Sequence, residues 1–133
     1  MTPPAGSGRP PVRILIVDDE PDMRIIERLS LAHDPRFVVV GEAGDGSEAI
    51  TAASQTQPDV VLLDLAMPIM SGMDALPAIR KASPSSRVVM LSALPADRHE
   101  PEALARGATA YLDKRAVPDL ATILGRLCDS PGG

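Results

Sequence analysis

The sequence predicts an α/β protein in which five parallel strands form one doubly wound sheet, with helices on both faces. Short runs rich in Val, Ile and Leu recur along the chain, and stretches with helical periodicity or turn residues separate them. Continuous apolar runs are typical of strands buried on both faces, as in a parallel sheet covered by helices. Because parallel strands point the same way, their carboxyl ends share the edge at which open α/β sheets bind ligands.

The expected elements follow one another as five strand–helix units, (βα)5. Strands are expected at 12–17, 37–40, 60–63, 88–91 and 110–112, and helices at 21–33, after Ser47, at 72–82, at 97–106 and at 118–127. Right-handed crossovers between parallel strands then favour the flavodoxin-like strand order 2-1-3-4-5.

The first and last expected helices are amphipathic, so each should bury one face against the sheet. In the first helix the apolar face is expected to consist of Met23, Ile26, Leu29 and Ala32. In the last helix it is expected to consist of Leu120, Ile123, Leu124 and Leu127.

Four residues mark the expected helix limits. Ser47 follows turn glycines and is expected to cap the second helix, since serine hydroxyls accept hydrogen bonds from free N–H groups. Pro77 should bend the third helix or delay its regular start, and Pro101 weakens the first turn of the fourth. Gly107 is expected to end the fourth helix.

Length and composition indicate one domain. The chain has 133 residues, of which 44% are hydrophobic and only 2% aromatic, so the core must consist of aliphatic side chains. The net charge is −5 and the pI is near 4.9, which argues against direct contact with nucleic acid or with an anionic membrane surface. Cys128 is the single cysteine, which excludes an internal disulfide and a cysteine-based zinc site.

The ends of the sequence differ in composition from its centre. Residues 1–11 hold four Pro and two Gly and are expected to form a disordered lead-in, residues 12–127 the domain, and residues 128–133 a tail or the start of a linker. No stretch resembles a signal peptide or reaches the roughly 20 apolar residues that span a bilayer. A cytoplasmic location is therefore expected.

Residues capable of phosphoryl chemistry stand where the apolar runs end. The runs end at Asp18-Asp19, at Asp64, at Ser92 and at Lys114. A carboxylate that attacks phosphorus forms an acyl phosphate, and Asp64 is the best candidate because it ends the central strand. Clustered carboxylates raise one another's pKa unless a cation intervenes, and Mg²⁺ prefers oxygen ligands and a phosphate oxygen. Lys114 and the Ser92 hydroxyl would contact further phosphate oxygens.

Taken singly, each of these residues has an ordinary structural explanation. An Asp at a strand end is usually a turn or capping residue, and an acidic Asp18-Asp19-Glu20 run suits a helix N-terminus. A lysine or serine at such a position is usually solvated or a cap. The functional interpretation depends on all of them meeting at one edge.

With these motifs together, the chain resembles the receiver domain of bacterial two-component response regulators over about residues 12–127. The matching segments are "ILIVDDE", "VVLLDLAMPIMSGMDAL", "VVMLSA" and "GATAYLDK". The segments "DPRFVVVGEAGDGSEAI" and "GATAYLDKRAVPDL" look most like receivers joined to a helix-turn-helix DNA-binding domain of the LuxR/NarL type.

The resemblance implies a role for each matching position. Asp64 corresponds to the phosphoacceptor and Lys114 to the lysine of the site, while Asp18, Asp19, Asp64 and the backbone carbonyl of Ala66 would hold Mg²⁺. Ser92 corresponds to the hydroxyl that moves toward the phosphoryl group, and Tyr111 to the aromatic switch residue. A sensor histidine kinase would be the phosphoryl donor.

The resemblance also implies an output surface, built by the fourth helix, fifth strand and fifth helix, which could form a homodimer. One departure concerns Arg115, which stands where the family often has a proline, so a cis peptide bond is not assumed there.

The sequence argues against two other classes of function and leaves a third alternative open. A phosphatase of the haloacid-dehalogenase type needs a second Asp two residues after the nucleophile, where this chain has Ala66. Nucleotide binding is not supported, because neither a P-loop motif nor G-x-G-x-x-G occurs. An interaction module that keeps the receiver fold but works without phosphorylation remains the open alternative.

Overall fold

The computed structural model describes residues 10–94 and 96–129, except for the side chains of residues 96 and 97. Its strands are β1 (Val12–Val17), β2 (Phe37–Ala43), β3 (Val60–Asp64), β4 (Arg87–Ser92) and β5 (Ala110–Asp113). Its helices are α1 (Pro21–Ala32), α2 (Gly46–Thr56), α3 (Gly72–Ala82), α4 (Ala96–Ala105) and α5 (Leu120–Asp129), with the 3₁₀ helix η1 (Lys114–Asp119) before α5.

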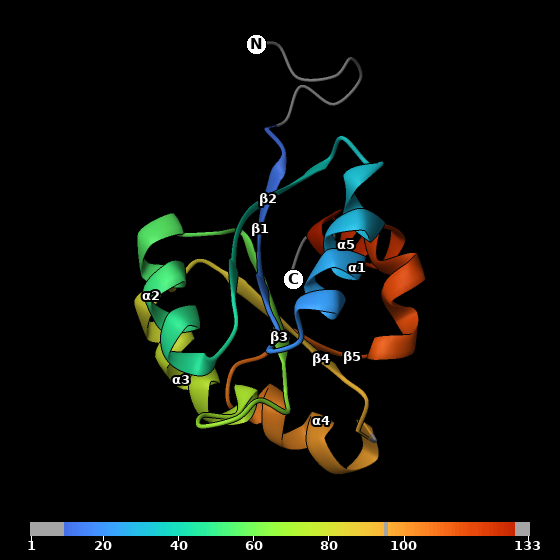
Figure 1. The fold of residues 1–133 in the computed structure, drawn as a ribbon. Helices are drawn as coiled ribbons and strands as arrows, with labels where there is room; N and C mark the ends of the chain where they lie inside the picture. Colours follow the sequence, from blue (N-terminus) through green and yellow to red (C-terminus); the bar gives the residue numbers. More distant parts are fainter. Residues whose placement is uncertain (1–9, 95, 130–133) are drawn as a thin grey trace.

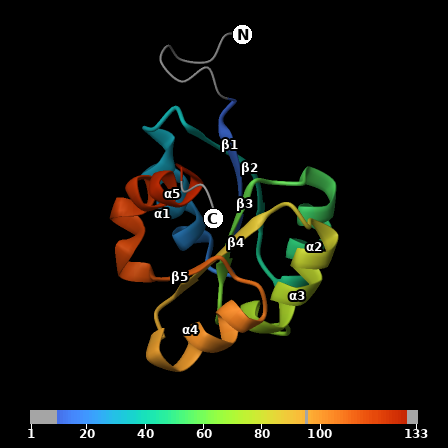
Figure 2. The same cartoon turned by 180° about the vertical axis from the view of Figure 1, so that it is seen from behind.

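The strands form one parallel sheet in the order β2-β1-β3-β4-β5, which confirms the predicted fold class. Helices α1 and α5 lie on one side of the sheet and α2 and α3 on the other, with α4 beside the carboxyl ends of the strands (Figures 1 and 2). The central strand β3 has no exposed residue, because it is covered on both faces and flanked by β1 and β4. The expected lead-in falls largely on residues 1–9 and the expected tail on residues 130–133, which lie outside the described part.

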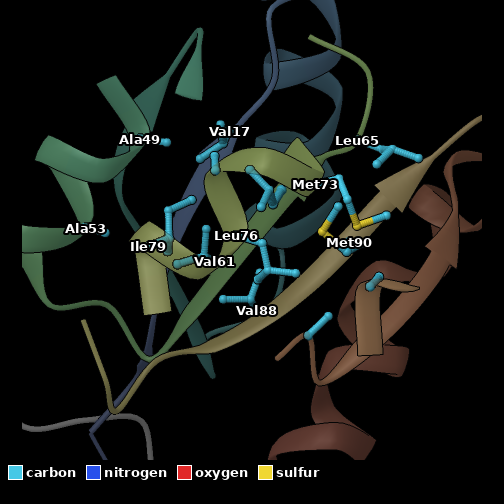
Figure 3. Close-up of a cluster of buried hydrophobic side chains, with 14 of the residues drawn as sticks. Val17, Ala49, Ala53, Val61, Leu65, Met73, Leu76, Ile79, Val88 and Met90 are labelled. Atoms are coloured by element: carbon cyan, nitrogen blue, oxygen red, sulfur yellow. The ribbon is translucent and has the colours of Figure 1, made fainter. Parts of the chain in front are cut away.

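Two aliphatic cores fill the space between the sheet and its helices. The larger core joins β1, β3 and β4 to α2, α3 and α4, and includes Val17, Val61, Leu76 and Met90 (Figure 3). The smaller core joins the opposite face of the sheet to α1 and α5, and includes Ile16, Leu31 and Leu124. Because both faces are covered, the polar groups at the strand ends are held by rigid, buried strands.

The apolar face predicted for α1 is wrong at three of its four positions, and of the four only Met23 packs against the smaller core. Ile26 and Leu29 are 49% and 57% exposed, and Ala32 is also exposed. The face toward the sheet instead contains Leu31 and the carboxylic acid Glu27. A pattern based on hydrophobicity alone could not find this face, because a charged residue stands in its middle.

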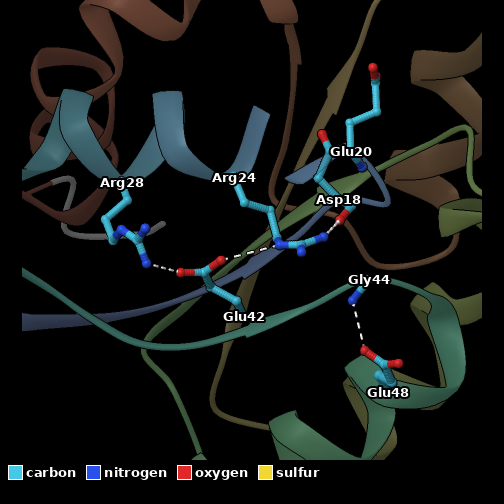
Figure 4. Close-up of polar contacts among 7 residues, drawn as sticks. All are labelled: Asp18, Glu20, Arg24, Arg28, Glu42, Gly44 and Glu48. Atoms are coloured by element: carbon cyan, nitrogen blue, oxygen red, sulfur yellow. Dashed lines mark hydrogen bonds and ion pairs between the residues drawn. The ribbon is translucent and has the colours of Figure 1, made fainter. Parts of the chain in front are cut away.

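The cap predicted for α2 is also wrong. Asp45, not Ser47, precedes the helix, and its carboxylate accepts a hydrogen bond from the Glu48 N–H at 2.8 Å. Glu48 in turn accepts from the N–H of Gly44, the residue before the cap, at 2.9 Å, so a second backbone N–H at the start of α2 is satisfied (Figure 4).

Helix α3 starts at Gly72, as expected, and is continuous through Pro77, so the proline does not delay its start; a bend at Pro77, the other effect expected, stays a prediction. Ser71 caps it by accepting from the Asp74 N–H at 3.1 Å. A proline has no N–H for the carbonyl four residues before it, which here belongs to Met73. Arg106, from the segment after α4, donates to that carbonyl at 3.2 Å, so the acceptor lost to the proline is satisfied from another element.

The other helix limits are close to those expected. Helix α4 ends at Ala105, and Gly107 follows with φ 110°, a conformation that favours glycine. Helix α5 starts at Leu120 rather than at Pro118, because the preceding residues form the 3₁₀ turn η1. Its expected face is confirmed, since Leu120 and Leu124 are fully buried.

Candidate functional site

Four strand ends place the predicted site residues at the same edge of the sheet. Asp18 directly follows β1, Asp64 and Ser92 are the last residues of β3 and β4, and Lys114 directly follows β5. Asp18, Asp64 and Ser92 are 0%, 3% and 1% exposed, so their polar groups depend on partners within the protein.

Lys114 connects the two buried carboxylates. Its Nζ lies 2.9 Å from Asp18 Oδ2 and 3.2 Å from Asp64 Oδ1. Although burial acts to lower it, the pKa of the Lys114 ammonium is raised overall because both carboxylates stabilise its charge. Residues from three separate strand ends therefore form one charged cluster, as the sequence predicts.

The pKa of Asp64 is raised from 3.8 to about 6. Burial is the largest cause, and the negative charge of Asp18 adds to it, while Lys114 and a hydrogen bond from the Ala66 N–H act in the opposite direction. Lys114 alone therefore does not offset the effects of burial and of the Asp18 charge on Asp64. A further cation would stabilise the ionised form of Asp64.

Acidic groups that could hold such a cation surround Asp18. One carboxylate oxygen from each of Asp18, Asp19 and Glu20 lies within 4.8 Å of the others. Asp18 Oδ1 accepts from the Glu20 N–H at 2.9 Å, whereas Asp18 Oδ2 has no hydrogen-bond partner apart from its ion pair with Lys114. An oxygen-only donor set fits Mg²⁺. Asp64 is not within this group of three and reaches Asp18 through Lys114.

Arg24 links the backbone of Asp18 to the edge strand β2 through two hydrogen bonds. Its Nη1 donates to the Asp18 carbonyl at 2.6 Å, and its Nε donates to Glu42 on β2 at 3.1 Å (Figure 4). Arg28, one turn further along α1, pairs with the other oxygen of Glu42. The guanidinium groups therefore fix the backbone from which Asp18 projects.

A glycine allows α3 to start directly beside the phosphoacceptor candidate. A Cβ on Gly72 would lie 2.0 Å from the carbonyl oxygen of Asp64, and the Gly72 N–H donates to the Leu65 carbonyl at 2.8 Å. Only a residue without a side chain fits at this distance. The spacing of Gly72 from Asp64 gives no hint of this contact in the sequence.

The hydroxyl and aromatic candidates lie on the neighbouring strands. Ser92 Oγ accepts a hydrogen bond from the Leu94 N–H at 2.9 Å. Tyr111 is only 7% exposed, and its hydroxyl donates to the Leu94 carbonyl at 3.3 Å. Ser92 and Tyr111 are therefore linked through one residue of the β4–α4 connection. The peptide bond between Lys114 and Arg115 is trans.

Glu27 is a site neighbour that the sequence analysis missed. It lies on α1, is 1% exposed, and has no hydrogen-bond partner for either carboxylate oxygen. Its pKa is raised from 4.5 to about 8; burial is the largest cause, Asp18 and Asp64 also act to raise it, and Lys114 acts to lower it. The available signal was its position four residues from both Met23 and Leu31, on the helix face that packs inward.

Comparison of the sequence with protein families matches residues 14–124 to the response regulator receiver domain. This match covers most of the chain, including every candidate site residue. The chain belongs to the response regulator receiver family.

Curated relatives agree with this assignment. The nitrate/nitrite response regulator protein NarL of Escherichia coli K12 is 38% identical over 113 residues, which are 85% of this chain and 52% of NarL. The transcriptional regulatory protein YxjL of Bacillus subtilis is 36% identical over 81% of this chain and 50% of its own length. The chain thus spans about half the length of these relatives.

Solved structures show the same fold. The response regulator domain of Thermotoga maritima CheB is 30% identical with a TM-score of 0.81, covering 92% of this chain and 100% of that domain. A LuxR-family two-component response regulator from Aurantimonas is also 30% identical with a TM-score of 0.81, covering 90% and 86%. The chain is therefore a receiver domain of the kind found in two-component response regulators.

Among its described residues, no helix is both long and apolar enough to cross a bilayer.

Proposed function

We propose that Asp64 is the phosphoacceptor of this receiver domain and that a sensor histidine kinase is its phosphoryl donor. The observation that carries the proposal is the Lys114 ammonium placed between Asp64 and Asp18, at the end of the central strand. A buried ion pair of this kind is expensive to keep, because both groups lose water. Its retention is readily explained if the lysine also meets the phosphoryl group.

The proposed step is a phosphoryl transfer. An ionised oxygen of Asp64 attacks the phosphorus of a phosphohistidine, a P–O bond forms, and the P–N bond breaks with its electron pair returning to the imidazole. Lys114, 3.2 Å from Asp64 Oδ1, contacts one phosphoryl oxygen. The Ser92 hydroxyl donates to another. Beyond this transfer and slow loss of the phosphoryl group to water, we propose no enzymatic turnover for the domain.

The residues present fit a bound Mg²⁺. Asp18, Asp19 and Asp64 would hold it with the backbone carbonyl of Ala66, and Asp18 Oδ2 is paired with no group of the protein other than the Lys114 ammonium. When bound, Mg²⁺ supplies positive charge that offsets the charge of the transferring group. Asp64 would then be held ionised, against the burial that raises its pKa to about 6.

The signal is proposed to leave through α4, β5 and α5. If Ser92 turns toward the phosphoryl group, its Oγ loses the hydrogen bond that the Leu94 N–H donates to it. The Tyr111 hydroxyl donates to the carbonyl of the same residue, so Leu94 connects Ser92 to Tyr111. The surface is also proposed to support a homodimer and to control a DNA-binding output domain. Amide hydrogen exchange with and without beryllofluoride tests this: altered exchange is expected within residues 93–125, and unchanged exchange there contradicts the switch.

The phosphoacceptor is tested by intact mass after incubation with acetyl phosphate and Mg²⁺. The parent protein should gain one phosphoryl group, and Asp64→Asn should gain none. Asp59→Asn is the matched control, because Asp59 directly precedes the same strand but lies at its opposite end. Phosphorylation of Asp64→Asn would contradict the assignment. A parent protein that is never phosphorylated would favour an interaction module that works without phosphorylation.

A further inference from the structure

Arg24, near the start of α1, reaches back to the acidic turn that precedes the helix. Its Nη1 donates to the Asp18 carbonyl at 2.6 Å while its Nε donates to Glu42 on β2 at 3.1 Å (Figure 4). A planar guanidinium can hold two such partners at once in a fixed geometry, whereas a lysine offers a single point charge on a flexible chain. The Arg24 side chain is only 22% exposed, so this arrangement is partly protected from water.

The Asp18 carbonyl lies where the pairing of β1 with β2 stops. Strand β1 ends at Val17, and the Asp18 N–H still donates to the Ala43 carbonyl at the end of β2, at 3.0 Å. The Asp18 carbonyl, in contrast, accepts from the Arg24 side chain. Glu20, which precedes α1, makes no side-chain capping hydrogen bond. Arg24 therefore takes over from strand pairing in holding the backbone of this turn.

The carbonyl that Arg24 contacts belongs to the peptide unit between Asp18 and Asp19. Because a peptide unit is planar, the direction of its carbonyl also fixes the N–H and the Cα of the following residue. The Asp18 carboxylate is held separately, by the Glu20 N–H and by Lys114. The direction in which Asp19 leaves the turn, relative to that fixed carboxylate, thus depends on the peptide unit held by Arg24.

We propose that Arg24 is a positioning residue of the cation site, which sets the spacing of the Asp18 and Asp19 carboxylates by holding the peptide unit between them. This inference rests on the proposed cation binding at Asp18. Mg²⁺ demands near-ideal octahedral geometry, so its affinity should be sensitive to small displacements of its oxygen ligands. Arg24 is itself positive and repels a bound cation, so it can favour binding only through geometry.

Charge and geometry therefore predict opposite effects of replacing Arg24. Loss of its positive charge removes a repulsion and should strengthen cation binding. Loss of its hydrogen bond frees the peptide unit and should weaken cation binding. Arg28 separates the two effects, because it pairs with the other oxygen of Glu42, whereas the contact with the Asp18 carbonyl comes from Arg24. Arg28→Gln thus removes a charge from the same helix and leaves both hydrogen bonds of Arg24 in place.

The test is binding of Mn²⁺, followed by the electron paramagnetic resonance signal of the free ion, and of Mg²⁺ by competition. The parent and Arg28→Gln are compared with Arg24→Lys, which keeps the charge but not the planar fork, and with Arg24→Gln, which removes both. Thermal unfolding followed by circular dichroism verifies that each variant is folded. Amide hydrogen exchange of residues 18–20 in a chelator shows, without any cation, whether the turn is held.

Both Arg24 variants should bind the two cations about tenfold more weakly than the parent, the usual effect of removing a group that orients metal ligands. Exchange at residues 18–20 should be faster in both, and Arg28→Gln should bind the cations at least as tightly as the parent. With acetyl phosphate, the Arg24 variants should need about tenfold more Mg²⁺ for half-maximal phosphorylation and should reach the parental rate at saturating Mg²⁺.

If either folded Arg24 variant binds Mn²⁺ as tightly as Arg28→Gln does, Arg24 does not position the site. A phosphorylation rate that saturating Mg²⁺ fails to restore would also contradict the proposal, because the defect would then lie outside cation binding. A parent that binds neither cation would overturn the proposed Mg²⁺ site itself, which is a separate outcome.

Discussion

The buried Glu27 carboxyl should make the stability of the cation-free protein depend on pH. Its pKa is raised from 4.5 to about 8, chiefly by burial. Between these values the folded protein binds more protons than the unfolded chain, so the free energy of unfolding falls as the pH rises. The stability that protonated Glu27 contributes is fully present below the pKa that the residue has in the unfolded chain. It is lost as the pH rises through the pKa of Glu27 in the folded protein.

The size of this effect follows from the same two pKa values. At about 1.4 kcal/mol for each unit, a rise from 4.5 to about 8 sets an upper limit of about 5 kcal/mol. Relaxation around a buried charge and entry of water reduce such penalties, so we expect about 2 kcal/mol to be observed. Asp64, whose pKa is also raised, is present in both parent and variant and so contributes little to their difference.

Glu27→Gln removes this titration and retains the shape of the side chain. Relative to the parent, the variant should therefore gain about 2 kcal/mol of unfolding free energy between about pH 5 and about pH 8. The measurement is urea unfolding, followed by circular dichroism in a chelator, at several pH values in that range. Asp22→Asn, which changes an exposed carboxylate of the same helix, should parallel the parent. A constant difference between parent and Glu27→Gln across the range would refute the reasoning.

Three further substitutions probe the surroundings of the phosphoacceptor. Gly72→Ala should destabilise the protein by several kcal/mol and slow phosphorylation, because its Cβ would lie 2.0 Å from the Asp64 carbonyl oxygen. Ile69→Asn should stabilise it by about 1 kcal/mol, because Ile69 is 99% exposed and holds φ 69°, which asparagine tolerates better. Ala66→Asn should speed dephosphorylation by about tenfold, because neither Ala66 nor Leu94 offers a polar side chain to orient the attacking water.

Each of these expectations has a clear contrary result. Urea unfolding that shows Gly72→Ala as stable as the parent would mean that α3 can move away from Asp64. No gain in Ile69→Asn would mean that the left-handed conformation carries little strain. For Ala66→Asn, phosphoprotein decay that is as slow as in the parent, or slower, would show that water reaches the acyl phosphate without help.

Most of the fold could be predicted from the sequence, because the hydrophobic pattern of each strand is visible in a short segment of the chain. The apolar runs around Ile16, Leu62 and Val89 are buried, which is typical of a parallel sheet that helices cover on both faces. The right-handed connection between parallel strands then restricts the possible strand orders. Asp64 and Lys114 could be brought together on this basis, since the ends of parallel strands share an edge.

The features that the sequence did not reveal depend on contacts between distant elements. The Met73 carbonyl left free by Pro77 is satisfied by Arg106, which comes from another helix connection. Gly72 is required by the backbone of Asp64, which only the packing of α3 on the end of β3 brings near.

The clearest difference concerns α1. Hydrophobicity alone placed Ile26 and Leu29 in the core, whereas tertiary packing buries Glu27 and leaves both exposed. The rotation of α1 about its axis is decided by how the helix packs on the sheet and on α5. An analysis of hydrophobic periodicity counts Glu27 as polar and therefore cannot detect this rotation. The sequence by itself thus determined the sheet, the edge and the residues that end its strands. Only the tertiary structure decided that a further carboxyl group, that of Glu27, is buried on α1, because its burial comes from neighbours on other elements.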